Sequence, residues 1–136
     1  MKPVRIALLG CGTVGTGVVR LMRSNAAKYA RMLGVPLELA AIADRSLKPD
    51  AALGITAKLI TRDSAALVAR DDIDIVVELF GGHDPARALI MRALAHGKDV
   101  VTGNKALLAE HGGEIFREAA AHGLAVGFEA SVGGGV

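Results

Sequence analysis

The chain has 136 residues, of which 51% are hydrophobic, and its formal net charge is +2. This size fits one domain with a single core. The 16 basic and 14 acidic residues are mixed along the chain, without the basic block that is typical of a surface binding nucleic acid. The single cysteine excludes an intramolecular disulfide, and no cysteine or histidine cluster indicates a metal site. Because there is no signal-peptide pattern and no apolar run of about 18 residues to span a bilayer, we expect a cytoplasmic protein without membrane partners.

Short apolar runs alternate with helical patterns in the first half of the chain. Residues 4–9 and 37–43 are typical of buried strands. Between them, apolar residues recur at helical spacing over 13–33, and Gly34 with Pro36 ends that run. Residues 46–57 carry loop signals, and a short edge strand is expected over 58–61.

The second half continues the alternation, with strands expected over 74–79, 99–102 and 124–128. Asp63 is typical of the N-cap of a brief helix that runs through residue 70, and Asp84 with Pro85 is typical of the N-cap and first turn of a helix ending at Gly97. Two helical segments follow 99–102, one from Lys105 and one over 114–122. Six strands in this alternation predict an α/β fold: a doubly wound, Rossmann-type parallel sheet, most simply in the order 3-2-1-4-5-6.

A glycine-rich loop, GCGTVG at residues 10–15, lies between the first strand and the first helix. In the G-x-G-x-x-G pattern the first glycine makes the tight turn, the second lets the backbone approach a pyrophosphate, and the third lets helix and strand pack closely. The helix N-terminus then faces the phosphates with its positive dipole end. We therefore predict dinucleotide binding by Gly10, Gly12, Thr13, Val14 and Gly15. Cys11 is interpreted as a small space-filling side chain.

The second strand ends at Asp44-Arg45, where the adenosine ribose of a dinucleotide would lie. An acidic residue here hydrogen-bonds the ribose hydroxyls of NAD and repels the 2′-phosphate of NADP, whereas an arginine pairs with that phosphate. Asp44 and Arg45 stand side by side, so the choice between NAD and NADP stays open.

Two further strand ends carry candidate residues. Gly81 follows the fourth strand, where a glycine lets the chain pass close to the nicotinamide half of the cofactor. Lys105 follows the fifth strand at the start of a helix, where the helix dipole repels cations. A lysine there can hydrogen-bond a substrate oxygen and move its proton, provided burial lowers the pKa of the amine. A surface lysine without a catalytic role is the alternative.

Four segments together resemble homoserine dehydrogenase: GCGTVG at 10–15, VVELFGG at 76–82, VTGNKALLA at 101–109 and FEASVGGG at 128–135. The resemblance covers the whole chain, residues 1–136, and corresponds to the family's N-terminal NAD(P)-binding domain. It implies interconversion of L-homoserine and L-aspartate 4-semialdehyde with NAD or NADP, in the branch leading to threonine, isoleucine and methionine. It also implies Lys105 as the catalytic lysine, beside both the nicotinamide of the cofactor and the substrate oxygen, and Arg45 as a contact of the adenosine ribose or its phosphate.

The resemblance further implies a sodium-type cation held mostly by backbone carbonyls at Glu129, Val132, Gly134 and Val136. The family's segment for substrate binding and dimerisation would begin after residue 136, so a full-length member is expected to be a homo-oligomer and this chain alone is expected to be incomplete for turnover. Two alternatives stay open. One is a non-catalytic dinucleotide-binding module that senses redox state or regulates a partner, and the other is a different Rossmann dehydrogenase acting on an amino or sugar acid.

Overall fold

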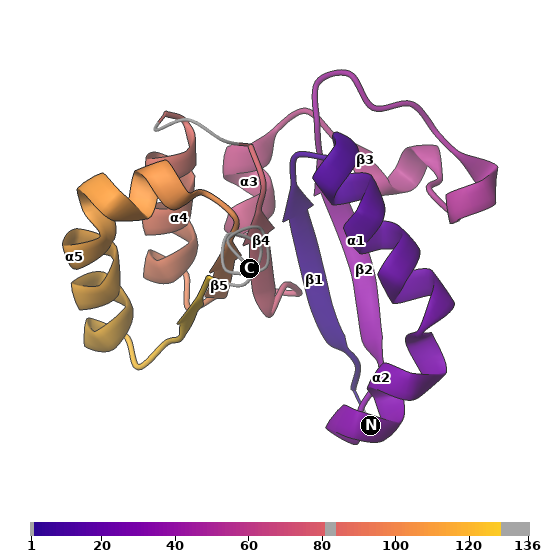
Figure 1. Ribbon diagram of the computed structural model, residues 1–136, viewed down its shortest axis with the longest axis horizontal. Helices are drawn as coiled ribbons and strands as arrows, with labels where there is room; N and C mark the ends of the chain where they lie inside the picture. Colours follow the sequence, from indigo (N-terminus) through magenta and orange to yellow (C-terminus); the bar gives the residue numbers. More distant parts are fainter. Residues whose placement is uncertain (1, 81–83, 129–136) are drawn as a thin grey trace.

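A parallel β-sheet lies at the centre of the chain in the computed structural model, which describes residues 2–80 and 84–128. In this described part the sheet has six strands in the order β3-β2-β1-β4-β5-β6 (Figure 1). The strands are β1 (Val4–Leu9), β2 (Leu37–Ala43), β3 (Ile60–Thr61), β4 (Ile75–Glu78), β5 (Asp99–Thr102) and β6 (Val126–Gly127). The predicted doubly wound sheet and its strand order are confirmed.

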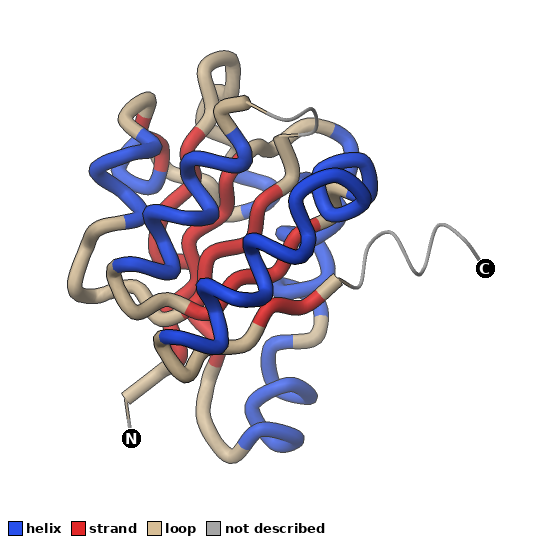
Figure 2. Tube along the Cα trace, turned by 90° about the vertical axis from the view of Figure 1, so that its left-hand side faces the viewer, coloured by secondary structure: helices blue, strands red, loops and turns tan. Residues whose placement is uncertain are grey.

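Helices cover both faces of the sheet (Figures 1 and 2). They are α1 (Thr13–Ser24), α2 (Ala26–Leu33), α3 (Ser64–Val68), α4 (Ala86–Ala95) and α5 (Lys105–Ala121), with two 3₁₀ turns, η1 (Ala51–Leu53) and η2 (Ala57–Leu59). The face that packs against α1 also packs against η1, and the opposite face packs against α3, α4 and α5. Within residues 2–80 and 84–128 no helix is both long and apolar enough to cross a membrane.

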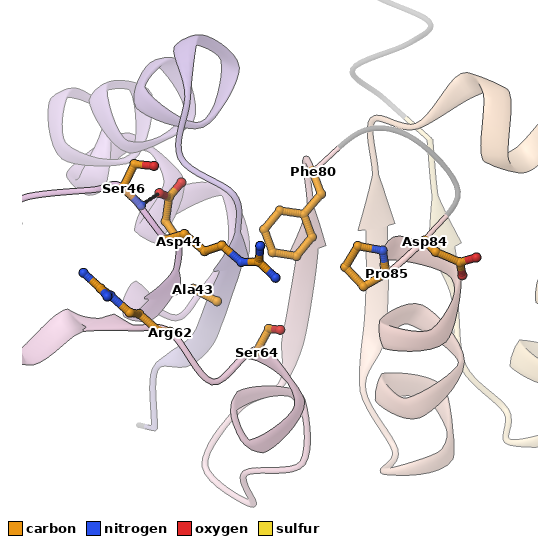
Figure 3. A pocket seen from close by; sticks show the side chains of 9 residues that line it. Ala43, Asp44, Ser46, Arg62, Ser64, Phe80, Asp84 and Pro85 are labelled. Atoms are coloured by element: carbon orange, nitrogen blue, oxygen red, sulfur yellow. Dashed lines mark hydrogen bonds between the residues drawn. The ribbon is translucent and has the colours of Figure 1, made fainter.

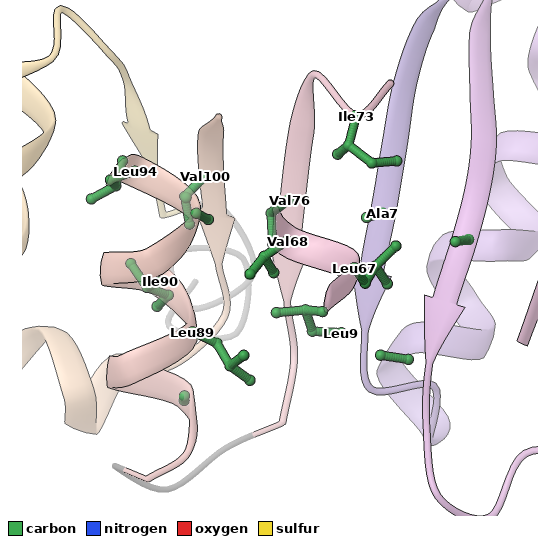
Figure 4. Packing of buried hydrophobic residues seen from close by; sticks show 14 of the residues in the cluster. Ala7, Leu9, Leu67, Val68, Ile73, Val76, Leu89, Ile90, Leu94 and Val100 are labelled. Carbon is green, nitrogen blue, oxygen red and sulfur yellow. The ribbon is translucent and has the colours of Figure 1, made fainter. Parts of the chain in front are cut away.

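The core is divided between these two faces because β1 is buried on both. Ala7 and Leu9 belong to the cluster under α3, α4 and α5, whereas Leu8 packs with Val19 of α1 on the other face. Figure 4 shows the larger cluster, where α4 lies over β4 and β5. A strand covered on both sides is apolar at every position rather than at every second one, which explains the continuous apolar run over residues 6–9 of β1.

The carboxyl ends of the strands meet at one edge of the sheet. Leu9 of β1 pairs with Ala43 of β2 on one side and with Glu78 of β4 on the other, and Glu78 pairs with Thr102 of β5. The chain leaves β1 toward β2 by way of α1 and later returns to the other side of β1 as β4. The strand order therefore changes direction at β1, between β1 and β4. In open α/β sheets, ligands bind in the crevice at the carboxyl ends of the strands at such a switch point.

The helix predictions need three corrections. The single helix expected over 13–33 is interrupted at Asn25, which ends α1 with its side-chain amide donating to Leu21 O (3.1 Å) and then precedes α2. The two segments expected after β5 are one helix, α5, in which Gly112 is buried; packing of α5 against α4 outweighs the low helix propensity of glycine. Asp84 is not the N-cap of α4; Pro85 occupies that position, after a cis peptide bond.

Candidate functional site

The glycine loop joins β1 to α1 and is held in a closely packed turn. Gly10 has φ +89°, a left-handed conformation that favours glycine, and its N–H donates to Ala43 O (2.8 Å). A Cβ on Gly15 would lie 2.6 Å from Gly10 O, so helix and strand approach too closely for any side chain there. These two glycines have the structural roles that the motif predicts.

Gly12 differs from both because it is open to solvent. A Cβ built on it would meet nothing within 4 Å. It is the N-cap of α1 without a side-chain cap, so the first backbone N–H groups of this helix face outward next to Thr13 and Val14, which are exposed. Helix N-termini of this kind attract phosphate groups in proteins generally.

Asp44 ties the glycine loop to the end of β2. One carboxylate oxygen accepts from Cys11 N (2.8 Å), and the other accepts from Ser46 N (2.8 Å) and Leu47 N (2.9 Å). Partial burial acts to raise the pKa of Asp44, but these three backbone hydrogen bonds outweigh it and the pKa lies below its ordinary value. The carboxylate therefore orders two loops, a role that the sequence pattern did not predict.

A pocket of about 420 Å³ opens beside Asp44, between the ends of β2, β3 and β4. Its polar lining comprises Asp44, Arg45, Ser46, Arg62, Ser64 and Asp84, and its apolar lining comprises Ala43, Phe80 and Pro85. Figure 3 shows these side chains around the pocket. Among the described residues, neither guanidinium forms an ion pair with an acidic side chain. The pocket thus brings together two guanidinium groups, the carboxylates of Asp44 and Asp84 and an apolar wall.

Arg62 was not identified from the sequence. It lies 17 residues beyond Arg45 and enters the same pocket because β3 pairs with β2 in parallel, with Thr61 beside Ala43. The only signal in the sequence is its position directly after a short strand. That signal has meaning only once the order of β2 and β3 is known.

The structure confirms the interpretation of Cys11 as a space-filling side chain. It is buried, burial raises the pKa of its thiol, and its sulfur lies 3.9 Å from Thr16 Oγ1. Thiol reactivity requires the thiolate, which this environment disfavours.

Lys105 is the first residue of α5, directly after the N-cap Asn104. It lies at the same edge of the sheet as the glycine loop, with β4 between β1 and β5. The side chain is exposed. The burial that we expected for a catalytic amine is therefore not provided by the described residues, and the catalytic role of Lys105 stays a prediction.

Five other candidate residues lie outside the described part of the chain: Gly81, Glu129, Val132, Gly134 and Val136. Within residues 2–80 and 84–128 there is no group of three or more His, Cys, Asp or Glu that could hold a metal ion. The predicted cation site stays untested.

Comparison with known proteins finds similarity to homoserine dehydrogenases. Residues 10–129 match the family model described as homoserine dehydrogenase, NAD binding domain. The homoserine dehydrogenase of Pseudomonas aeruginosa is 45% identical over 136 residues, which is all of this chain and 31% of that protein. The enzyme of Corynebacterium glutamicum is 46% identical over 134 residues, 98% of this chain and 30% of its own length. The chain thus spans less than a third of these relatives.

Solved structures agree with the sequence relatives. A homoserine dehydrogenase from Thiobacillus denitrificans superposes with a TM-score of 0.87 at 45% identity, covering 95% of this chain and 30% of that one. A hyperthermophilic archaeal homoserine dehydrogenase in complex with NADPH superposes with a TM-score of 0.75 at 25% identity, covering 96% of this chain and 44% of that one. None of these matches favours a non-catalytic sensor or a dehydrogenase of another family.

Proposed function

The chain belongs to the homoserine dehydrogenase family, whose NAD-binding domain it contains, and on this premise we propose that it binds NADP(H) at the carboxyl edge of its sheet. The observation that carries the proposal is the empty space around Gly12 at the uncapped N-terminus of α1. Backbone N–H groups there can approach a pyrophosphate without a side chain in between. The pocket next to this loop then accepts the adenosine half.

Preference for NADP over NAD rests on the charges in that pocket. Arg45 and Arg62 both line it, and a guanidinium is well suited to bind a phosphate with paired hydrogen bonds. Asp44, which could have selected against the 2′-phosphate, already accepts three backbone hydrogen bonds with its two oxygens. Arg45 and Arg62 therefore offer two guanidinium groups to a 2′-phosphate, in a pocket that also contains the carboxylates of Asp44 and Asp84.

Titration of the chain with NADPH and NADH, followed by nicotinamide fluorescence, tests this preference. Arg45→Ala and Arg62→Ala should each weaken NADPH binding by tenfold or more, because a hydrogen bond to a charged group contributes about 1.5–3 kcal/mol. NADH binding should change less than twofold. Arg31→Ala on α2, an exposed arginine outside the pocket, is the matched control. Equal losses for NADPH and NADH would contradict the phosphate role.

For the full reaction we propose the NADP-dependent interconversion of L-homoserine and L-aspartate 4-semialdehyde, a small-molecule substrate pair. When bound, the nicotinamide supplies or accepts the hydride. Lys105 would hydrogen-bond the substrate oxygen and move its proton, with burial completed by the remainder of the protein that the longer relatives possess. A monovalent cation at Glu129, Val132, Gly134 and Val136, a homo-oligomeric assembly and a cytoplasmic location belong to the same proposal.

The 136-residue chain should bind NADPH weakly and fail to reduce NADP in the presence of homoserine, because most groups that position the substrate lie elsewhere. A chimaera tests catalysis: this chain replaces the matching 31% of the Pseudomonas aeruginosa relative. Lys105→Ala in the chimaera should abolish turnover while NADPH binding persists. Rapid turnover by the isolated chain, or by the Lys105→Ala chimaera, would overturn the respective assignment.

A further inference from the structure

A buried carboxylate stands at the end of β4, where the fold alone would favour an apolar residue. Glu78 has no exposed surface, and neither has Thr102, its register partner at the end of β5. The Thr102 hydroxyl donates to Glu78 Oε1 (2.5 Å), and Phe80 N donates to Glu78 Oε2 (2.8 Å). Both carboxylate oxygens therefore accept hydrogen bonds inside the protein.

The hydrogen bonds continue from Thr102 to the start of α5. Thr102 Oγ1 accepts from Asn104 N (3.0 Å), and Asn104 Oδ1 accepts from Leu107 N (3.0 Å), which caps the helix. Asn104 is 5% exposed, and Lys105 follows it directly. Glu78, Thr102 and Asn104 form one connected chain, here called the Glu78 network, that leads from β4 to the residue before the lysine.

Packing alone does not require polar side chains at these buried positions. A polar group removed from water without partners costs about 1–3 kcal/mol in proteins. Val76, two residues earlier on the same face of β4, is fully buried without any such requirement. Among the described residues no buried side-chain nitrogen or oxygen lacks a partner. A buried polar network whose members all have hydrogen-bond partners holds the surrounding structure rigidly in one arrangement. We therefore expect the Glu78 network to favour a single geometry.

That geometry joins the two turns that follow β4 and β5. Glu78 O also accepts from Gly103 N (3.1 Å), so the turn after β5 is held to the same residue by its backbone as well. The turn after β4 contains Phe80, which lines the pocket and also lies against Gly10 of the glycine loop. Through Glu78, the start of α5 is therefore placed relative to the cofactor pocket.

We propose that Glu78 is a positioning residue for Lys105: its carboxylate, acting through the Thr102 hydroxyl and the Asn104 N-cap, sets where α5 begins relative to the bound dinucleotide. This inference rests on the catalytic role proposed above for Lys105. Glu78 does not contact the reacting atoms in this arrangement. It acts on them by fixing the backbone that carries the amine, and misplacement by about 1 Å can cost about a hundredfold in rate.

Amide hydrogen exchange of the 136-residue chain tests whether the network couples the two turns. Glu78→Gln replaces one acceptor oxygen by a donor, so the side chain can no longer accept from both Thr102 and Phe80. The amide of Asn104, which Glu78 does not contact, should then exchange at least tenfold faster, together with that of Leu107. Unchanged exchange at Asn104 in a folded Glu78→Gln protein would overturn the proposal.

Kinetics of the chimaera test whether the coupling matters for Lys105. Thr102→Val removes the hydroxyl but leaves the Phe80–Glu78 hydrogen bond, so the NADPH dissociation constant should stay within twofold while kcat falls 10- to 100-fold. Thr102→Ser keeps the hydroxyl and should restore kcat to within threefold of the parent. If Thr102 contributed only to stability, Thr102→Ser and Thr102→Val would lose activity to the same extent, or neither would change kcat. Either result would overturn the proposal.

The same measurements separate this inference from the function on which it rests. If the parent chain fails to bind NADPH, or if Lys105→Ala retains turnover, the proposed function itself is wrong. If the parent binds NADPH and needs Lys105, but Thr102→Val turns over at the parent rate, only the positioning role of Glu78 is wrong. The amide-exchange experiment needs no activity, so it decides the coupling in either case.

Discussion

The contact between α1 and the end of β1 leads to a sharp prediction about Gly15. Alanine at this position would place its Cβ 2.6 Å from Gly10 O and 3.3 Å from Gly10 C. Both are backbone atoms of a tight turn, so no side-chain rotation relieves the contact. Either α1 moves away from the sheet or the glycine loop changes its conformation.

Gly17, in the same helix, provides the matched control because a Cβ there would meet nothing within 4 Å. Replacing glycine by alanine inside a helix stabilises a protein by about 0.5–1 kcal/mol, and Gly17→Ala should show this gain. Gly15→Ala receives a similar gain but adds an overpacking cost of about 1–3 kcal/mol. The free energies of unfolding of the two variants should therefore differ by about 1–3 kcal/mol, with Gly15→Ala the less stable.

Urea unfolding followed by far-UV circular dichroism measures this difference, and NADPH titration of the same samples measures its effect on binding. Gly15→Ala should also bind NADPH more weakly, because the displaced loop no longer presents its N–H groups correctly. If Gly15→Ala proves as stable as Gly17→Ala and binds NADPH equally well, the close approach of helix and strand does not exist in solution.

Three further predictions concern single side chains. Gly12→Ala should leave the free energy of unfolding within about 0.5 kcal/mol of the parent but weaken NADPH binding tenfold or more, since its Cβ enters space that is otherwise empty; unchanged affinity would remove this loop from the site. Asp63→Ala should destabilise the chain by about 1 kcal/mol, because Asp63 caps α3 by accepting from Ala66 N (3.0 Å), whereas Asp63→Asn should retain most of that stability in the same urea assay; equal losses would refute the cap. The hydrogen bonds from Arg70 hold the pKa of Asp72 at about 2, below its ordinary 3.8, so the pair stabilises the fold fully above pH 4 and loses this contribution as the pH falls toward 2. Because Asp72 is 45% exposed, the stability lost in Asp72→Asn at pH 7 should stay below about 1 kcal/mol and shrink by pH 3, and a difference independent of pH would contradict the assignment.

The existence of the strands was predictable because each is defined by residues close together in the sequence, although β3, β4 and β6 are shorter than the expected 58–61, 74–79 and 124–128. The expected boundaries of β1, β2 and β5 match the structure, and the strand order follows from right-handed crossovers. Helix ends were less predictable. At Asn25 and at Gly112 the outcome depends on whether tertiary packing compensates an unfavourable residue, and no local pattern contains that information.

The candidate binding residues divide in the same way. Gly12 and Gly15 are identifiable from sequence since their roles depend on the backbone of the loop itself. Gly10 is identifiable by the tight turn it makes, although a Cβ there would also meet Leu79 and Phe80 of another strand end. The role of Asp44 in ordering that loop was not identifiable, although Asp44 itself was a candidate. Its partner Cys11 is 33 residues away, and the contact exists only because β1 and β2 are adjacent.

The sequence by itself determined the sheet, the glycine loop and the place of Lys105 after β5, because periodicity and turn chemistry act over a few residues. Only the tertiary structure decided which distant side chains share a site. It brought Arg62 to Arg45 through the pairing of β3 with β2, and it set Glu78 against Thr102 through the register of β4 and β5. Such contacts depend on strand order and register together, and these are properties of the whole sheet rather than of any segment.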